Sequence, residues 1–424
     1  MPSEPIKYLD IFAGAGGLSE GFMRVGFEPI AHVEKEEAAS YTLKTRLAYH
    51  WLRREGLLNK YDRYLKGELT REDLYKLVPA NMLSSVLTYD ISENTIQEVF
   101  DKIDEMLGDD EVDLIIGGPP CQAYSLVGRS RDENRMLNDG RNYLYKLYAR
   151  FLERYKPEYF VFENVVGLLS AKNAAGIRYL DSMIALFDQT GYSIEYKTLD
   201  SSDYGVLQKR KRIIIIGKRA RKEKGFYPSI EKVQSNVKVK EIFTDLPKLK
   251  AGEGSYEPVA VGPYDGTYLI EAGIRDISET YVTYHIARPH CPRDLAIYRL
   301  AVLLWNSEHK RLSYKDLPEY LRTHKNLHSF LDRFKVVEGD CCSAHTVVAH
   351  IAKDGHYYIH PDINQNRSIT PREAARLQSF PDSFHFESKS GKYSRTSAFL
   401  QIGNAVPVRM AEQIAKAIKG LYSE

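Results

Sequence analysis

The sequence predicts an α/β fold, with a mainly parallel β-sheet that carries helices on both of its faces. Apolar segments of strand length alternate with helical segments up to about residue 218. A glycine-rich turn follows the first predicted strand, and an acidic residue or a cysteine stands at the end of several others. Strands that alternate with helices favour a parallel sheet, and ligands of such sheets bind at the carboxyl ends of the strands.

The predicted strands can be followed in order along the chain. The first, Tyr8–Phe12, leads into a turn with three glycines, and apolar residues then recur at helical spacing over 18–25. The second ends at Glu34 and the third ends near Asp90, with a charged segment between them that we expect to be a helical insert at about 42–87. The later predicted strands are 112–118, 158–165, 192–200 and 212–218.

The alternation of strands and helices is lost after about residue 226. Residues 226–365 mix proline, glycine, tyrosine and histidine with short apolar runs, which indicates a second domain. A helix is predicted again where Thr370 and Glu373 form a capping box around Pro371. The last predicted helix has one apolar face, made by Val408, Ala411, Ile414, Ala415 and Ile418.

Composition narrows the class of protein. The 424 residues exceed the usual size of one compact core. Lys and Arg total 59 and Asp and Glu total 57, so net charge says little about partners, although 208–225 is strongly basic. Four cysteines make no disulfide framework and suit a reducing compartment. No apolar run is long enough to span a bilayer, so we expect a cytoplasmic protein without a membrane partner.

The glycine turn and two acids indicate an adenosine-containing cofactor. The turn lacks the lysine and serine of a phosphate-binding loop. Glu34 follows about 20 residues later at a strand end, where a carboxylate typically bonds a ribose hydroxyl. Asp90 could accept a hydrogen bond from an adenine amino group. The alternative is a set of helix-packing glycines with two solvated acids.

Cys121 and Glu163 are the candidate reactive groups. Cys121 stands in "GGPPCQAYS", where two prolines fix the backbone after an apolar strand. It is either a small buried hydrophobe or a nucleophile, whose thiolate would need a cation such as Arg210 or Arg212. Glu163 is either an acid that carries a proton in an apolar pocket or a strand-edge residue that faces water.

Six motifs are spread in order over residues 8–418, namely "DIFAGAGGLSEGF", "GGPPCQAYS", "FENV", "QKRKR", "RSITPREAARLQSFPD" and "QIGNAVPVRMAEQIAKAI". They resemble those of the DNA (cytosine-5) methyltransferases. Tyr124 departs from the family, which usually has phenylalanine there, and the insert at 42–87 is absent from its shortest members. Any one motif could arise by chance, but six in the family's order are a specific signal.

The resemblance implies a Rossmann-like S-adenosylmethionine-dependent methyltransferase sheet and a smaller, irregular target recognition domain. The expected division is a catalytic and cofactor-binding domain at 1–225, the target recognition domain at 226–384, and a segment at 385–424 that returns to the catalytic domain. The enzyme would move a methyl group from S-adenosylmethionine to C5 of a cytosine flipped out of a specific duplex sequence, and would release S-adenosylhomocysteine.

The resemblance also assigns roles to residues. Cys121 would attack C6 of the cytosine and Glu163 would act on N3, while Arg210 and Arg212 would hold the base oxygen and a phosphate. The expected DNA-binding residues are Gln122, Ser125, Arg129 and Gln208. The expected cofactor-binding residues are Phe12, Gly14, Gly16, Gly17, Leu18, Glu34, Asp90, Ile91, Pro119, Leu144, Asn404 and Val406.

The partner implied by the resemblance is double-stranded DNA, bound by a monomer in the nucleoid of a prokaryote, with a separately encoded restriction endonuclease as a candidate second partner. Two alternatives are a transfer RNA (cytosine-5) methyltransferase with the same site and a catalytically inactive DNA-binding protein. The large second domain favours DNA. No metal is expected, because no standard zinc spacing occurs among His285, His290, Cys291, Cys341, Cys342, His345 and His350.

Overall fold

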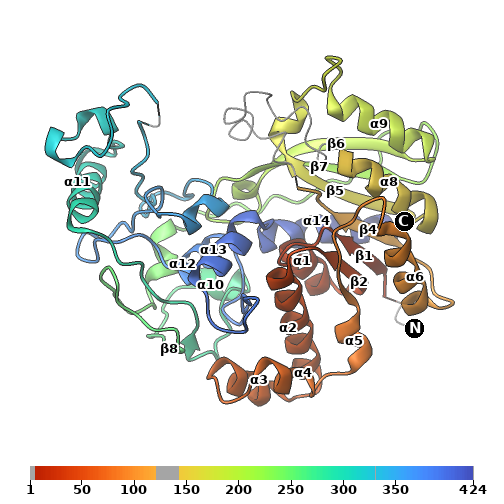
Figure 1. Cartoon of the computed structure of the whole chain (residues 1–424), viewed down its shortest axis with the longest axis horizontal. Helices are drawn as coiled ribbons and strands as arrows, with labels where there is room; N and C mark the ends of the chain where they lie inside the picture. Colours follow the sequence, from red (N-terminus) through yellow and green to blue (C-terminus); the bar gives the residue numbers. More distant parts are fainter. Residues whose placement is uncertain (1–4, 121–142, 330, 424) are drawn as a thin grey trace.

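The computed structural model describes residues 5–120, 143–329 and 331–423 (Figure 1). Within these residues a seven-stranded sheet has the order β3-β2-β1-β4-β5-β7-β6. β1 to β5 pair in parallel, and β7 runs antiparallel to both β5 and β6, so the predicted mainly parallel sheet is confirmed. The strands are β1 Lys7–Ile11, β2 Glu28–Glu34, β3 Val86–Thr88, β4 Leu114–Gly117, β5 Tyr159–Val165, β6 Ser193–Asp200 and β7 Lys211–Lys218.

Helices cover both faces of the sheet, as predicted. Side chains of α6 (Ile96–Leu107), α8 (Leu144–Tyr155) and α9 (Tyr179–Gln189) form one hydrophobic core with the strands. Side chains of α1 (Gly17–Val25) and α14 (Val408–Leu421) form a second core with the same strands. The predicted apolar face of α14 is buried in full. The last helix, α14, therefore covers one face of the sheet to which the first strand, β1, belongs.

Strand β4 is apolar throughout because both faces of the sheet are covered. Ile115 of β4 lies in the core of α6, α8 and α9, whereas its neighbours Leu114 and Ile116 lie in the core of α1 and α14. A strand with one face in water would alternate apolar and polar residues instead. This double burial explains why "LII" at 114–116 is an unbroken hydrophobic run.

The predicted insert is helical, although its first helix begins before residue 42. It contains α2 (Glu37–Arg54), α3 (Leu58–Leu65), α4 (Arg71–Tyr75) and α5 (Ala80–Ser84). The side chain of Thr70 accepts a hydrogen bond from the N–H of Asp73, 3.1 Å away, and so caps α4. The insert has a small core of its own, made by Ala48, Tyr49, Leu52, Tyr61, Tyr64, Leu65, Leu74 and Val78.

The region after residue 226 is irregular, with two hydrophobic cores. One core surrounds α12 and α13, and the other surrounds α11, which lies farthest from the sheet in Figure 1. The capping box of Thr370 and Glu373 is present at the start of α12. The elements are β8 Val259–Ala260, α10 Tyr268–Glu271, β9 Tyr281–Val282, α11 Pro292–Glu308, α12 Pro371–Leu377 and α13 Arg395–Asn404. The short 3-10 turns of the chain are η2 Val166–Leu169, η3 Ser201–Asp203, η4 Val239–Phe243, η5 Tyr314–Asp316, η6 Glu319–Leu321 and η7 Ala349–Ala352.

The predicted boundary at 384/385 falls inside one of these cores. Phe384 before it and Phe399 and Ile402 after it pack in the same cluster around α12.

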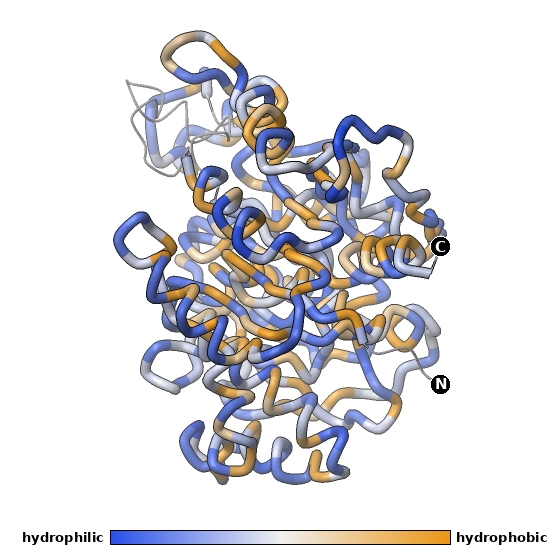
Figure 2. The backbone as a smooth tube through the Cα atoms, turned by 90° about the vertical axis from the view of Figure 1, so that its right-hand side faces the viewer, coloured by the Kyte–Doolittle hydropathy of each residue, from blue (hydrophilic) through white to orange (hydrophobic). Residues whose placement is uncertain are grey.

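Figure 2 shows hydrophobic segments of the tube running through the interior, with hydrophilic segments on the outer loops. Among the described residues, no helix is both long enough and apolar enough to cross a bilayer.

Candidate active site

A cavity of about 1770 Å³ lies at the carboxyl ends of β1, β2, β4 and β5. Its walls also include residues of α13 and of the loop after it, which places the two halves of the chain on one site. Among the predicted cofactor-binding residues, all except Gly16 line this cavity. Gly16 instead faces Leu43, since an added Cβ would lie 2.6 Å from Leu43 Cδ2.

Gly17 brings the glycine turn against the C-terminal wall. A Cβ added at this position would lie 2.5 Å from the backbone oxygen of Val406, so only glycine permits the approach. Val406 is itself buried, and Asn404 beside it is exposed to the cavity. The glycine turn thus holds residues 404–406 next to the first strand.

Glu34 is a buried carboxylate at the end of β2. It accepts hydrogen bonds from the N–H groups of Gly14, at 2.7 Å, and Glu36, at 2.8 Å. Burial raises the pKa of Glu34, and these two N–H groups act in the opposite direction. Asp90, at the neighbouring strand end, is exposed to the cavity, and Ile91 is buried beside it. Both acids line the cavity, and their bonds to a ribose and an adenine stay predictions.

Asp10 also lines the cavity and was missed by sequence reasoning. It is 1% exposed, and neither of its carboxylate oxygens has a hydrogen-bond partner among the described residues. Burial, with the nearby charge of Glu34, raises the pKa of Asp10 well above its ordinary value. The signal was available, because a carboxylate inside an apolar strand is rare unless it has a partner.

Glu163 and Arg212 form an ion pair beside Gly118, in the segment that leads from β4 to Cys121. Arg212 Nε lies 2.7 Å from Glu163 Oε1, and the two side chains are 13% and 15% exposed. The carboxyl group therefore has a cationic neighbour, which neither of the two alternatives considered from the sequence included. Gly118 packs directly on Glu163, since an added Cβ would lie 2.7 Å from Oε2. Asn164 Nδ2 donates to the oxygen of Pro119 at 3.4 Å and holds the same loop from the other side.

Gln208 and Arg210 are buried, in contrast to Arg212. Nε2 of Gln208 donates to Gln378 Oε1 at 3.0 Å, and the side chain is wholly enclosed. Gln208 is thus enclosed within the protein, and its contact with DNA stays a prediction. The guanidinium of Arg210 donates to the backbone oxygens of Val347, at 2.6 Å, and Gly403, at 3.1 Å. These bonds fit a role in holding the cavity wall, and a catalytic role for Arg210 stays a prediction.

Four predicted residues lie outside the described part of the chain. They are the expected nucleophile and three expected DNA contacts, namely Cys121, Gln122, Ser125 and Arg129. The described residues before this gap end at Pro120, which lines the same cavity as Glu163.

The described histidines and cysteines after residue 226 have different surroundings. His285 lies between Thr370 and the oxygen of Pro247, and His345 contacts Glu338 at 2.9 Å. Cys291 and Cys342 are exposed. Within residues 5–120, 143–329 and 331–423, no group of three or more His, Cys, Asp or Glu residues could hold a metal ion.

Comparisons with known proteins agree with this geometry. The profile of the family described as "C-5 cytosine-specific DNA methylase" matches residues 6–52 and 73–420. The type II methyltransferase M.Bpa9945I of Bacillus paralicheniformis is 41% identical, over 98% of this chain and 99% of its own. M.DdeI of Desulfomicrobium norvegicum is 30% identical, over 98% of this chain and 89% of its own.

Solved structures share the fold. A prophage-encoded protein from E. coli, described as a DNA modification methyltransferase, has a TM-score of 0.61 at 22% identity and covers 99% of this chain and all of its own. The Entamoeba histolytica methyltransferase EhMeth has a TM-score of 0.53 at 14% identity and covers 99% of both chains.

Proposed function

The chain belongs to the C-5 cytosine-specific DNA methylase family and is a DNA (cytosine-5) methyltransferase, and we propose that it uses Cys121 as its nucleophile and S-adenosylmethionine as its methyl donor. The observation that carries this proposal is the Glu163–Arg212 pair. It lies against Gly118, three residues before Cys121, in the wall of the cavity that the predicted cofactor residues line.

The residues of the cavity fit the proposed cofactor. The carboxylate of Asp10 has no partner among the described residues, and an ammonium group such as that of a methionine moiety would satisfy it. Glu34 would accept from ribose hydroxyls, because its two oxygens have more lone pairs than the two N–H groups occupy. S-adenosylmethionine, when bound, supplies an electrophilic methyl group and leaves as S-adenosylhomocysteine.

The chain's own residues would activate the cytosine. The thiolate of Cys121 adds to C6, and the electron pair of the C5–C6 double bond becomes available at C5. Glu163 donates a proton or a hydrogen bond to N3 and so takes up the charge that develops on the ring. Arg212 orients Glu163, and its remaining N–H donors hold the base oxygen. After methylation a base removes the C5 proton, and Cys121 leaves.

The proposed substrate is a specific sequence in double-stranded DNA, and the proposed setting is a prokaryotic cytoplasm. The relatives named type II methyltransferases support a modification role and a separately encoded restriction endonuclease. We propose a monomer whose target recognition domain spans 226–384. The large irregular region after the sheet supports this placement of the domain. The target cytosine would have to leave the stack to reach Glu163, at a cost of a few kcal/mol.

A trapping experiment tests the nucleophile. The protein is incubated with S-adenosylmethionine and duplex DNA that carries 5-fluorocytosine in place of cytosine. Fluorine blocks the final loss of the C5 substituent, so we expect an adduct that survives denaturing electrophoresis. Cys121→Ser should form none, whereas Cys291→Ser, at an exposed cysteine, should form as much as the wild type. An adduct in Cys121→Ser would refute the assignment.

A further inference from the structure

Residues 53–72, here named the α3 segment, lie between the two parts of the chain that match the family profile. The segment contains α3 and the start of α4. It contacts parts of the chain more than 200 residues away. Tyr61 Oη donates to the oxygen of Ser383 at 2.9 Å, and Tyr281 Oη donates to Asp62 Oδ1 at 2.7 Å. The segment therefore joins the insert to both the irregular region and the residues before α13.

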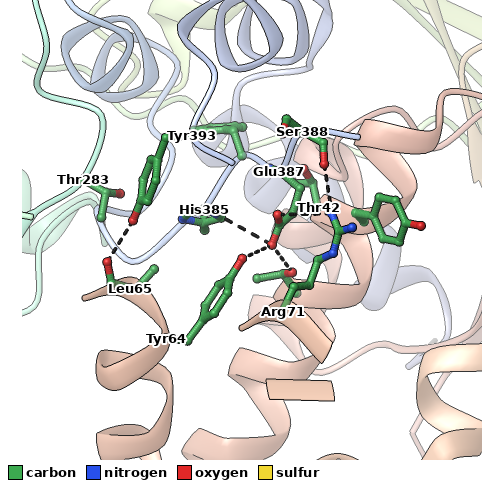
Figure 3. Close-up of polar contacts among 12 residues, drawn as sticks. Thr42, Tyr64, Leu65, Arg71, Thr283, His385, Glu387, Ser388 and Tyr393 are labelled. Atoms are coloured by element: carbon green, nitrogen blue, oxygen red, sulfur yellow. Dashed lines mark hydrogen bonds and ion pairs between the residues drawn. The ribbon is translucent and has the colours of Figure 1, made fainter. Parts of the chain in front are cut away.

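Glu387 is the centre of these contacts. Its side chain is 1% exposed, and Thr45 Oγ1 donates to Oε1 at 2.6 Å. Tyr64 Oη, from the α3 segment, donates to the same oxygen. Arg71 Nη1 lies 3.6 Å from Glu387 Oε2 and donates to the oxygen of Ser388 at 2.9 Å. Figure 3 shows Tyr64 and Arg71 reaching up from their helices toward Glu387 on the loop above them.

A buried carboxylate makes this cluster sensitive to its donors. Burial raises the pKa of Glu387, and the hydrogen bonds from Thr45 and Tyr64 and the charge of Arg71 oppose that effect. Removal of one partner from a buried polar group costs more than the same removal at a surface, because water cannot replace the lost bond. Tyr64 and Arg71 therefore fix where Glu387 lies.

The backbone of Glu387 is tied in turn to the cavity wall. Its N–H donates to Thr42 Oγ1 at 2.8 Å, and Thr42 Oγ1 donates to Gln401 Oε1 at 2.6 Å. Nε2 of Gln401 donates back to the oxygen of Glu387 at 2.8 Å. Gln401 and Asn404 both belong to α13 and both line the cavity. A continuous set of bonds thus runs from Tyr64 to the wall of the proposed cofactor site.

We propose that the α3 segment is a positioning element that, through Glu387, holds α13 in place as a wall of the cofactor cavity and so sets the affinity for S-adenosylmethionine. The claim about affinity rests on the cofactor proposed above. Neither Tyr64 nor Arg71 lines the cavity, so both act through Glu387 and Gln401.

The test uses Tyr64→Phe, which removes one hydroxyl and leaves the ring in its packing against Tyr61. The matched control is Tyr192→Phe. Tyr192 is as deeply buried, and its hydroxyl donates to the oxygen of Pro157 at 2.7 Å, at the end of the sheet remote from the cavity. Calorimetric titration with S-adenosylmethionine should show affinity three- to ten-fold weaker in Tyr64→Phe and within two-fold of wild type in the control. Arg71→Ala should weaken affinity in the same direction.

Hydrogen–deuterium exchange of the ligand-free proteins gives a second readout. The backbone amides of 383–404 should exchange faster in Tyr64→Phe than in either the wild type or Tyr192→Phe. Wild-type affinity and exchange in both Tyr64→Phe and Arg71→Ala would overturn the proposal. Equal losses of affinity in Tyr64→Phe and Tyr192→Phe would also overturn it, since general destabilisation would then explain both. If the wild type binds no S-adenosylmethionine, the proposed cofactor and the claim about affinity fail together, and exchange alone decides whether the segment holds α13.

Discussion

Arg212 Nε contacts Glu163 Oε1 at 2.7 Å because β7 runs antiparallel to β5. Arg212 stands at the second position of β7 and is paired with Val165, at the last position of β5. In a wholly parallel sheet the beginning of β7 would lie at the opposite edge, far from the cavity. Because β7 is reversed, the guanidinium of Arg212 lies at the carboxyl ends of the parallel strands.

Loss of this pair should reduce turnover more than cofactor binding. We expect Glu163→Gln to lower turnover by about 100-fold or more, because it removes a contact that strengthens in the transition state. Arg212→Lys keeps the charge but loses the planar fork, and should cost at least about ten-fold. Steady-state kinetics and calorimetry measure the two effects. Arg219→Lys, just beyond the other end of β7, is the control. Wild-type turnover in Arg212→Lys would show that the planar fork of Arg212 has no part in catalysis.

Asp10→Asn should separate binding from stability. Removal of the charge should weaken S-adenosylmethionine binding at least about ten-fold, since charge-assisted hydrogen bonds are the strong ones. The ligand-free protein should melt no lower than the wild type, because a buried carboxylate without a partner is itself costly. Calorimetry and thermal unfolding test the two halves. A lower melting temperature with unchanged affinity would make Asp10 a structural residue.

Gly17→Ala should damage the junction between the glycine turn and residues 404–406. Its Cβ would lie 2.5 Å from the oxygen of Val406, and relief of such a clash typically costs about 1–3 kcal/mol of stability. Gly420→Ala is the control within α14, since nothing lies within 4 Å of an added Cβ there and alanine favours a helix. Chemical denaturation of both variants measures the difference. Equal stability of the two variants would contradict the close approach.

Acid should destabilise the fold from about pH 6.5 downward. Burial lowers the pKa of His32 and His290 to about 4, and of His360 and His385 to about 3. An unfolded histidine has a pKa of about 6.5, so between these values the unfolded chain binds more protons and stability falls as the pH falls. Each such histidine contributes up to about 1.4 kcal/mol per pH unit.

Thermal unfolding measured from pH 7 to pH 5 checks this dependence. His385→Phe keeps an aromatic ring against Tyr64 and Tyr284 and should flatten the slope, whatever its effect on absolute stability. His328→Phe, at an exposed position, should leave the slope unchanged. A slope that is the same in His385→Phe and the wild type would show that this ring titrates normally in the folded protein.

Residues 226–365 should determine which DNA sequence the enzyme methylates. Replacement of this span by the matching span of an enzyme of known specificity should give a protein that methylates the donor's site, as mapped by bisulfite sequencing. The donor must supply compatible partners for α13, because Ala349 of the exchanged span packs on Gly403. An active chimera that keeps the original site would place recognition elsewhere, and the insert at 42–87 would be examined next.

Local pattern predicted the elements that depend on neighbouring residues. The strands, the cap at Thr370 and the apolar face of α14 follow from spacing over a few positions, and the structure confirms them. The reversed β7 and the contacts of Glu387 depend on pairs far apart in the chain, and a single sequence carries little information about such pairs. The burial of Gln208 likewise depends on distant partners such as Gln378, so the sequence did not predict it.

The position of α14 has a consequence for biosynthesis. Phe22 and Leu114 are buried against Met410 and Ile414, which a ribosome adds almost 300 residues after Leu114. At roughly 5–20 residues per second, synthesis of 226–407 takes about 10 to 40 s, and α1 covers that face of the sheet without α14 during this time. The nascent chain therefore cannot complete the fold in the order of its translation. The hydrophobic surface that α14 covers therefore has no native partner until the last helix emerges.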